Sequence, residues 1–124
     1  SGTFIFEGSG GLNLLDNYQQ GCTGCMPACE VPWAIVPLWR ELVNGNVEKA
    51  KKIQEALTSL VSMMSSDLDA YIAAEKHFLV RQGIFQNTNV RGPVGYRPDR
   101  ETLEELERRF ECLEHTLGRE SVSK

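Results

Sequence analysis

The chain has 124 residues and a formal net charge of −4, from 17 acidic and 13 basic side chains. This length suits one domain with a sizeable core, and the acidic balance lacks the basic footprint of a nucleic-acid-binding protein. No apolar run approaches the roughly 20 residues that span a bilayer, and the first residues do not have the pattern of a signal peptide. We therefore expect neither nucleic acid nor a membrane as a partner.

The first 30 residues have the pattern of one strand–helix–strand unit. Residues 3–7 form a short apolar run that ends at three glycines within residues 8–11, which suits a buried strand and a tight turn. An apolar stripe predicts a helix over residues 12–20, with Gly21 as its stop, and residues 23–28 form the second strand candidate. Because parallel strands need a crossover of about a dozen residues, this spacing favours a parallel pair over a hairpin.

Helices are predicted for most of the remaining chain. Pro32 suits the first turn of a helix, and Pro37 should kink this helix or shift its start. Asn46 is expected to cap the helix that follows. A break at residues 65–67 precedes a third apolar stripe, which Gly83 closes.

Residues 86–97 are rich in turn signals and are expected to form an ordered loop, in which Arg91 could bind backbone carbonyls. Asp99 should cap the last helix, whose apolar residues repeat every three or four positions up to Leu117. His77 and His115 lie on predicted helices among polar neighbours, so we expect both to be solvated.

Three of the four cysteines lie close together, at Cys22, Cys25 and Cys29. Thiolates at this spacing can bind a soft metal, but residues three apart on a strand point to opposite faces, so small buried thiols are the favoured interpretation. Disulfide-rich secreted domains spread their cysteines over loop-rich chains, whereas this chain is helix-rich. We therefore expect reduced thiols, no metal, and a cytoplasmic protein.

Four short motifs, in this order and spacing, resemble the C-terminal part of the dihydrodipicolinate synthase and N-acetylneuraminate lyase family. They are FEGSGG at 6–11, GCTGCMPA at 21–28, NGN at 44–46, and the segment from Lys76 to Phe85 that runs into VRGP at 90–93. The family consists of class I aldolases, lyases and dehydratases on a (β/α)8 TIM barrel with added C-terminal helices. The resemblance implies an α/β fold in which residues 3–7 and 23–28 are the seventh and eighth barrel strands, followed by a helical bundle.

The resemblance also implies which chemistry is outside this segment. In the family, a lysine on the sixth strand forms a Schiff base with pyruvate or another 2-keto acid, and a tyrosine from the fourth strand relays protons. Both strands precede residue 1 in the alignment that the motifs suggest, so no catalytic residue is assigned here and no cofactor is implied. Lys49, Lys51, Lys52 and Lys76 fall on predicted helices.

One wall of the substrate pocket does carry over by resemblance, because the active sites of such barrels lie at the C-terminal ends of the strands. Its expected residues follow the two strands: Gly8, Ser9, Gly10, Cys25, Met26, Pro27 and Ala28. Many relatives carry acidic residues near positions 9 and 10, so the small Ser9 and Gly10 suggest a bulkier or an acidic sugar-derived keto acid. Glu7, just before this wall, is expected to have a structural role at the strand end.

Two strands of a barrel leave open edges that invite pairing with another chain. We expect residues 1–45 to hold the two strands with their helices, residues 46–118 the C-terminal helices of the same domain, and residues 119–124 a frayed tail. The expected partner is a complementary N-terminal barrel half or further copies of the chain. The function hypothesis is the C-terminal portion of a Schiff-base lyase, inactive alone; the alternative is a non-catalytic helical oligomerisation module or a truncated remnant.

Overall fold

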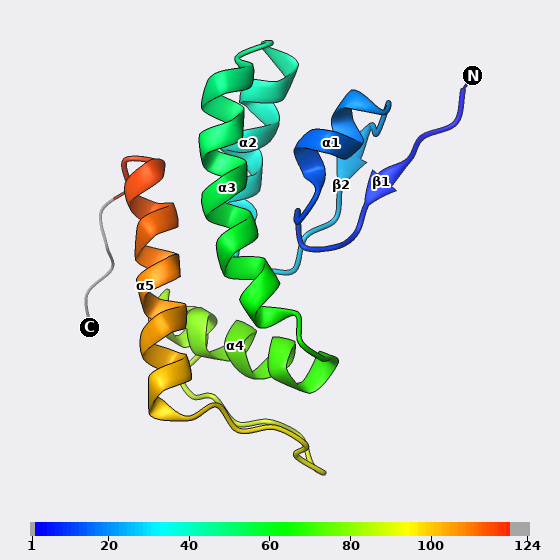
Figure 1. Ribbon diagram of the computed structural model, residues 1–124. Helices are drawn as coiled ribbons and strands as arrows, with labels where there is room; N and C mark the ends of the chain where they lie inside the picture. Colours follow the sequence, from blue (N-terminus) through cyan, green and yellow to red (C-terminus); the bar gives the residue numbers. More distant parts are fainter. Residues whose placement is uncertain (1, 120–124) are drawn as a thin grey trace.

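The computed structural model describes residues 2–119, so residues 120–124 of the expected tail lie outside the described part of the chain. It is a helix-dominated chain with a small parallel sheet (Figure 1). In chain order the elements are β1 (Phe6–Glu7), α1 (Leu14–Gln19), β2 (Gly24–Cys25), α2 (Pro32–Val43), α3 (Val47–Met64), α4 (Leu68–Arg81) and α5 (Arg100–Thr116).

The two strands pair in parallel, with Phe6 opposite Gly24 and Glu7 opposite Cys25, which confirms the predicted pairing. The amide of Met26 donates to the Glu7 carbonyl at 2.8 Å at the end of the pair. Both strands are shorter than predicted. In the described residues each strand has only one neighbour, so the flanking residues have no second ladder to extend them.

The helix boundaries follow the capping signals with one exception. The side chains of Asp67 and Asp99 accept hydrogen bonds from the amides of Ala70 (2.8 Å) and Thr102 (2.7 Å), as expected of N-caps. Asn46 occupies the N-cap position of α3, as predicted, but its side chain makes no capping hydrogen bond; the side-chain amide donates to the Glu41 carboxylate at 2.7 Å instead. α2 begins at Pro32 and contains Pro37, so the second proline does not displace its start.

The core lies around α3, which runs between α2 and α5, while α4 crosses below them (Figure 1). The rings of Phe78 on α4 and Phe110 on α5 stack with their centroids 4.4 Å apart, and Trp33 packs against the Phe110 ring. The predicted apolar stripes supply this core, including Ile53, Leu57, Leu60, Val61, Leu106 and Leu113. None of the described helices has the length and apolar character that crossing a bilayer requires.

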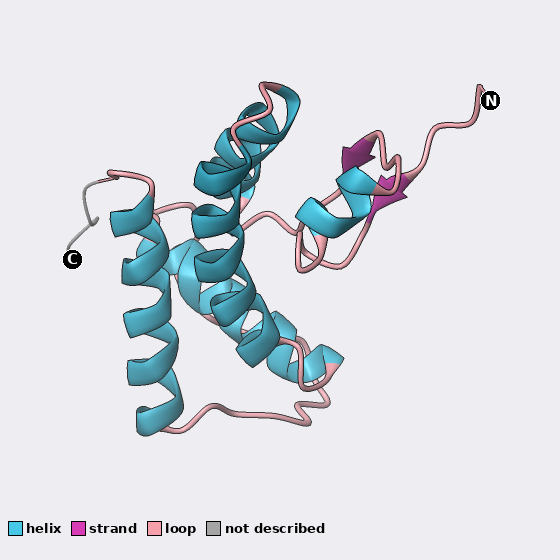
Figure 2. Ribbon diagram, turned by 45° about the horizontal axis from the view of Figure 1, so that its top comes forward, coloured by secondary structure: helices cyan, strands magenta, loops and turns pink. Residues whose placement is uncertain are grey.

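The β1–α1–β2 unit packs on one side of the helices, opposite α5, and the segment that precedes β1 projects outward (Figure 2). Leu14 and Leu15 of α1 enter the shared core. Gln54 of α3 joins the two parts, because its side chain accepts from the Leu15 amide and donates to the carbonyls of Gly11 and Leu12. The strand unit is therefore anchored through its helix, while its strands lie at the periphery.

Candidate functional site

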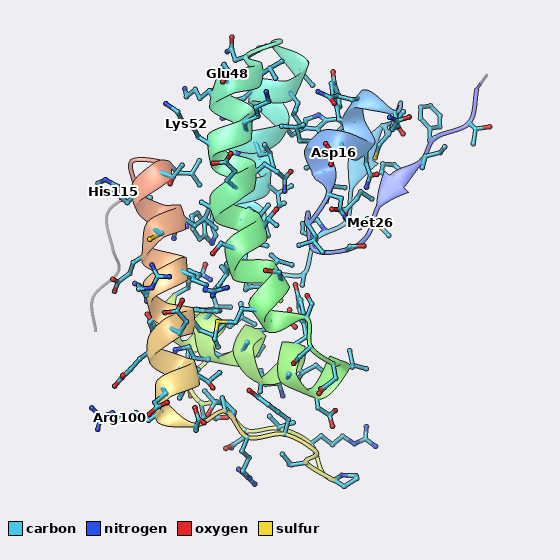
Figure 3. All side chains as sticks on the ribbon, viewed as in Figure 1. Asp16, Met26, Glu48, Lys52, Arg100 and His115 are labelled. Atoms are coloured by element: carbon cyan, nitrogen blue, oxygen red, sulfur yellow. The ribbon has the colours of Figure 1, made fainter. Side chains whose placement is uncertain are left out.

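The strand pair brings the two halves of the expected pocket wall to one edge. Because β1 and β2 are parallel, the segments that follow Glu7 and Cys25 leave the sheet side by side. Within this wall Gly10 is buried, Gly8, Ser9 and Met26 are exposed, and Cys25, Pro27 and Ala28 are half-buried. Met26, at the end of β2, lies on the opposite side of the helices from α5 (Figure 3).

Glu7 organises the turn at the end of β1. Its side chain is buried and accepts hydrogen bonds from the amides of Ser9 and Gly11, both at 3.1 Å. The thiol of Cys25 donates to the same carboxylate at 3.2 Å. Glu7 therefore has the structural role expected at the strand end, and it also ties the two halves of the wall together.

The glycines of this turn are required by both conformation and space. Gly10 and Gly11 have φ values of +69° and +84°, which side-chain-bearing residues adopt at a cost. A Cβ atom at Gly10 would lie 3.0 Å from the hydroxyl oxygen of Tyr71, and one at Gly11 would collide with Ile35. The wall is thus pressed closely against α2 and α4.

The thiols near the wall are held in the neutral form. Burial and the hydrogen bond to Glu7 raise the pKa of Cys25 to about 12, and the hydrogen bond to Glu75 followed by burial raises the pKa of Cys29 to about 11. Because the thiolate is the nucleophile and the metal ligand, neither side chain is poised for such chemistry. Within residues 2–119 no cluster of three or more histidine, cysteine or acidic side chains could hold a metal ion.

A partly buried acidic cluster behind the wall was not predicted. Glu30 is fully buried just after the wall, and its carboxylate accepts from the Tyr71 hydroxyl at 2.7 Å. Glu75, one helical turn after Tyr71 on α4, accepts hydrogen bonds from the backbone amide and the thiol of Cys29 at 3.3 and 3.0 Å. The signal that could have revealed it is the polar pair Tyr71 and Glu75 at i, i+4 beside the apolar stripe of α4.

A second set of buried charges joins α4 to α5. Arg81 is only 9 % exposed and forms ion pairs with Glu107 at 2.7 Å and with Glu114 at 2.9 Å. His77 contacts Glu107 at 2.6 Å and is about a quarter exposed, so the expectation of a solvated histidine was wrong here. The ion pairs lie on the far side of α4 from the pocket wall and serve packing of the two helices.

The structure also gives the positions of the four lysines and of Arg91 in the loop before α5. Lys49, Lys51 and Lys52 lie on α3, and Lys76 lies on α4, all away from the strand ends. Arg91 is exposed and does not fix the 84–99 loop as expected. Instead the ammonium group of Lys76 donates to the Asn89 carbonyl at 2.7 Å.

The outer side of the strand pair is apolar and open. Phe4, Ile5 and Phe6 are 77, 58 and 56 % exposed, and Met26 is 69 % exposed. A groove of about 370 Å³ lies beside them, lined by Phe6, Thr23, Gly24, Cys25, Ile35, Val36, Trp39 and Arg40. Strands of parallel sheets are normally covered on both faces, so this side has the character of a surface that lacks its cover.

Comparisons with known proteins add no relative to this geometry. No family model matches the sequence, and neither a curated protein nor a solved structure matches it. The motifs and the geometry of the strand pair are therefore the features that bear on its function.

Proposed function

We propose that the chain is the C-terminal portion of a cytoplasmic Schiff-base lyase of the dihydrodipicolinate synthase type, acting on pyruvate or another 2-keto acid. It contributes one wall of the pocket and the helices behind it. The lysine that forms the Schiff base and the tyrosine that relays protons would come from barrel strands outside these 124 residues. The four cysteines, all free thiols, agree with a reducing compartment.

The open parallel strand pair is the observation that carries this proposal. A two-stranded parallel sheet with a helical crossover is a piece of a larger α/β sheet, because such sheets bury both faces. The exposed Phe4, Ile5 and Phe6 are the side chains that neighbouring barrel strands and helices would cover. Covering them removes apolar surface from water at about 25 cal/mol per Å², which favours assembly.

The wall itself supports a role in shape rather than in chemistry. Ser9 and Gly10 are small and uncharged, and the Cys25 thiol remains protonated. They leave room for the distal part of a 2-keto acid without repelling an anionic group. This side of the pocket would select a bulkier or acidic sugar-derived substrate, while bond cleavage takes place at the lysine.

The test is Schiff-base trapping by borohydride in the presence of pyruvate. The 124-residue chain is first examined by size exclusion with light scattering and by denaturing mass spectrometry, then mixed with a polypeptide that supplies the first six strands of a family barrel. We expect a complex in which a pyruvate adduct forms on the added polypeptide and none on this chain. No complex, or a complex that forms no adduct with any 2-keto acid, would contradict the proposal.

A wall variant tests the substrate side. In the assembled enzyme, Ser9→Asp should raise KM for keto acids with an anionic distal group, because the distal group of such substrates reaches this loop. The KM for pyruvate, which has no distal group, should stay unchanged. Ser62→Asp is the matched control, since Ser62 is exposed on α3, away from the strand ends. Equal effects of the two variants would show that Ser9 does not face substrate.

A second candidate function is a non-catalytic helical oligomerisation module. It is favoured by the core of α2, α3, α4 and α5, which buries Leu60, Phe78 and Phe110 without help from the strands. In that case the exposed strand edges would pair with further copies of the chain. A stable homo-oligomer that resists mixing with barrel strands and forms no adduct would favour this candidate.

A further inference from the structure

The loop before α5 runs back along α4 and is held against it at two places (Figure 1). The ammonium group of Lys76 donates to the Asn89 carbonyl at 2.7 Å. Nearer the start of α4, Gly95 lies so close to the Asp69 carboxylate that a Cβ atom at Gly95 would collide with it. The course of the loop is therefore set by α4, although most of its residues are exposed.

The space between this loop, α4 and α5 is a pocket of about 490 Å³, a volume in the range of small-molecule sites. Apolar side chains form much of its lining: Ala73, Val90, Val94, Pro98 and Leu103. Polar side chains of the loop join them, namely Thr88, Asn89, Tyr96 and Arg97. An apolar surface with a few polar groups that fix orientation is typical of sites for small organic molecules.

Three of these polar side chains have no partner in the described part of the chain. No hydrogen bond or ion pair to the described residues is made by the side chains of Thr88, Tyr96 and Arg97. His77 also lines the pocket and is already paired with Glu107 at 2.6 Å. No acidic side chain lines the pocket among the described residues, so the positive charge of Arg97 is not neutralised there.

We propose that this pocket binds a small organic carboxylate, with its apolar body against α4 and α5 and its carboxylate group at Arg97. The planar guanidinium fork matches a carboxylate and can donate two parallel hydrogen bonds to it. The hydroxyl groups of Tyr96 and Thr88 are further donors in the same lining. The apolar lining favours an organic anion over an inorganic one, because an apolar body that covers it leaves water.

The site lies on the side of α4 opposite to the pocket wall. Ala73 and His77, which line it, are four residues apart and share one face of the helix. Tyr71 and Glu75 contact the segment that follows β2, and each lies two residues away, on the other face. All the described lining residues lie within 73–103, so this site goes beyond the proposed function and does not use the strand pair.

Amide NMR of the ¹⁵N-labelled 124-residue chain tests the proposal, with benzoate as the probe. Acetate supplies the charge without the ring, benzamide supplies the ring without the charge, and inorganic phosphate supplies an anion without an apolar body. We expect saturable shifts with benzoate, largest at the amides of the lining residues, and weaker binding of the other three compounds. Shifts that do not saturate or that spread over the surface would overturn the proposal, as would equal binding of acetate, benzamide or phosphate.

Two loop arginines provide a matched pair of variants. Arg97→Gln should weaken benzoate binding by about tenfold, because it removes the charge-assisted hydrogen bonds to the carboxylate, and should leave benzamide binding unchanged. Arg91→Gln makes the same change of charge at an exposed residue of the same loop that does not line the pocket, so it should bind benzoate like the wild type. Equal losses in the two variants would show that Arg97 acts only through net charge and would overturn the proposal.

A variant that fills the pocket tests the apolar part of the site. Ala73→Leu adds a larger apolar side chain to the lining without changing the charge, so it should abolish binding of both benzoate and benzamide. Undiminished binding of benzoate to Ala73→Leu would overturn the proposal. If this variant does not give the spectrum of a folded chain, the comparison of Arg97→Gln with Arg91→Gln decides, because both positions are exposed.

Discussion

The two sides of α4 bury carboxyl groups in opposite ways. On the side of α5, Glu107 and Glu114 meet the guanidinium group of Arg81, and Glu107 also meets His77. On the side of the pocket wall, Glu30 meets a tyrosine hydroxyl and a second carboxyl group. The same residue type thus meets a cation on one side of α4 and, among the described residues, none on the other.

The difference shows that the partners, rather than burial alone, decide the direction in which the pKa of a buried carboxyl group shifts. Partial burial opposes ionisation of Glu107, but the hydrogen bond from His77 and the charge of Arg81 outweigh it and lower its pKa. Burial of Glu30 meets no cation, so its pKa is raised. The two sides of α4 should therefore respond with opposite sign to a change of pH.

Removing the cation from the α5 side should have the largest effect. We expect Arg81→Leu to lower the free energy of unfolding by about 3–5 kcal/mol, because Glu114 would be left in the interior without its counter-charge. The measurement is urea denaturation at neutral pH.

Arg108→Leu is the matched control for this change. Arg108 is 63 % exposed and pairs with Glu105 of the same helix, so its replacement should leave stability near that of the wild type. If Arg81→Leu and Arg108→Leu behaved alike, the ion pairs between α4 and α5 would not carry the contact.

An intermediate effect is expected on the wall side from Tyr71→Phe. The variant keeps the ring but removes the donor to Glu30, and an unsatisfied buried acceptor costs about 1–3 kcal/mol. Tyr18→Phe serves as control, because the Tyr18 ring packs edge-on against Trp39 and no hydrogen bond is made by its hydroxyl to the described residues. Thermal denaturation of both variants would show whether the hydroxyl of Tyr71 matters; equal midpoints would contradict this prediction.

The smallest effect is expected from replacing Glu107, and the direction in which it changes with pH tests the difference between the two sides of α4. Glu107→Gln should cost about 0.5–1 kcal/mol at neutral pH, as expected for a partly exposed ion pair. Because the pKa of Glu107 is lowered in the folded state, the wild-type advantage should vanish as pH falls through that pKa. Because the pKa of Glu30 is raised, its contribution runs the other way, so plots of stability against pH for Glu107→Gln and Glu30→Gln should diverge. Parallel plots would contradict the opposite directions of the two pKa shifts.

Much of the fold could be predicted because it depends on local patterns. The apolar stripes of α3 and α5, the caps at Asp67 and Asp99, and the parallel crossover all follow from spacing and side-chain chemistry. Asn46 takes the N-cap position of α3 without a side-chain capping bond, because Glu41 on the preceding helix offers its side-chain amide a charged acceptor. Strand length was overestimated for a similar reason, since a strand extends only as far as its neighbours pair with it.

Only the part of the candidate site that directly follows the two strands in sequence could be predicted. The segments after β1 and β2 meet because parallel strands end at one edge, and their residues were named from the motifs. Glu30, Tyr71 and Glu75 could not be, because 41 residues separate the first two in sequence. The i, i+4 pair Tyr71 and Glu75 marks a polar side of α4, but spacing alone does not say that this side faces the wall.

The sequence by itself determined where helices begin and end, which side chains form the core, and that two parallel strands flank a glycine-rich turn. Those features depend on neighbours within a few residues, where spacing fixes geometry. Only the tertiary structure decided which carboxyl groups have a raised or a lowered pKa, which thiols stay neutral, and that the strand pair is left uncovered on its outer side. Charge and exposure depend on groups far away in the chain, and these meet only when the helices pack.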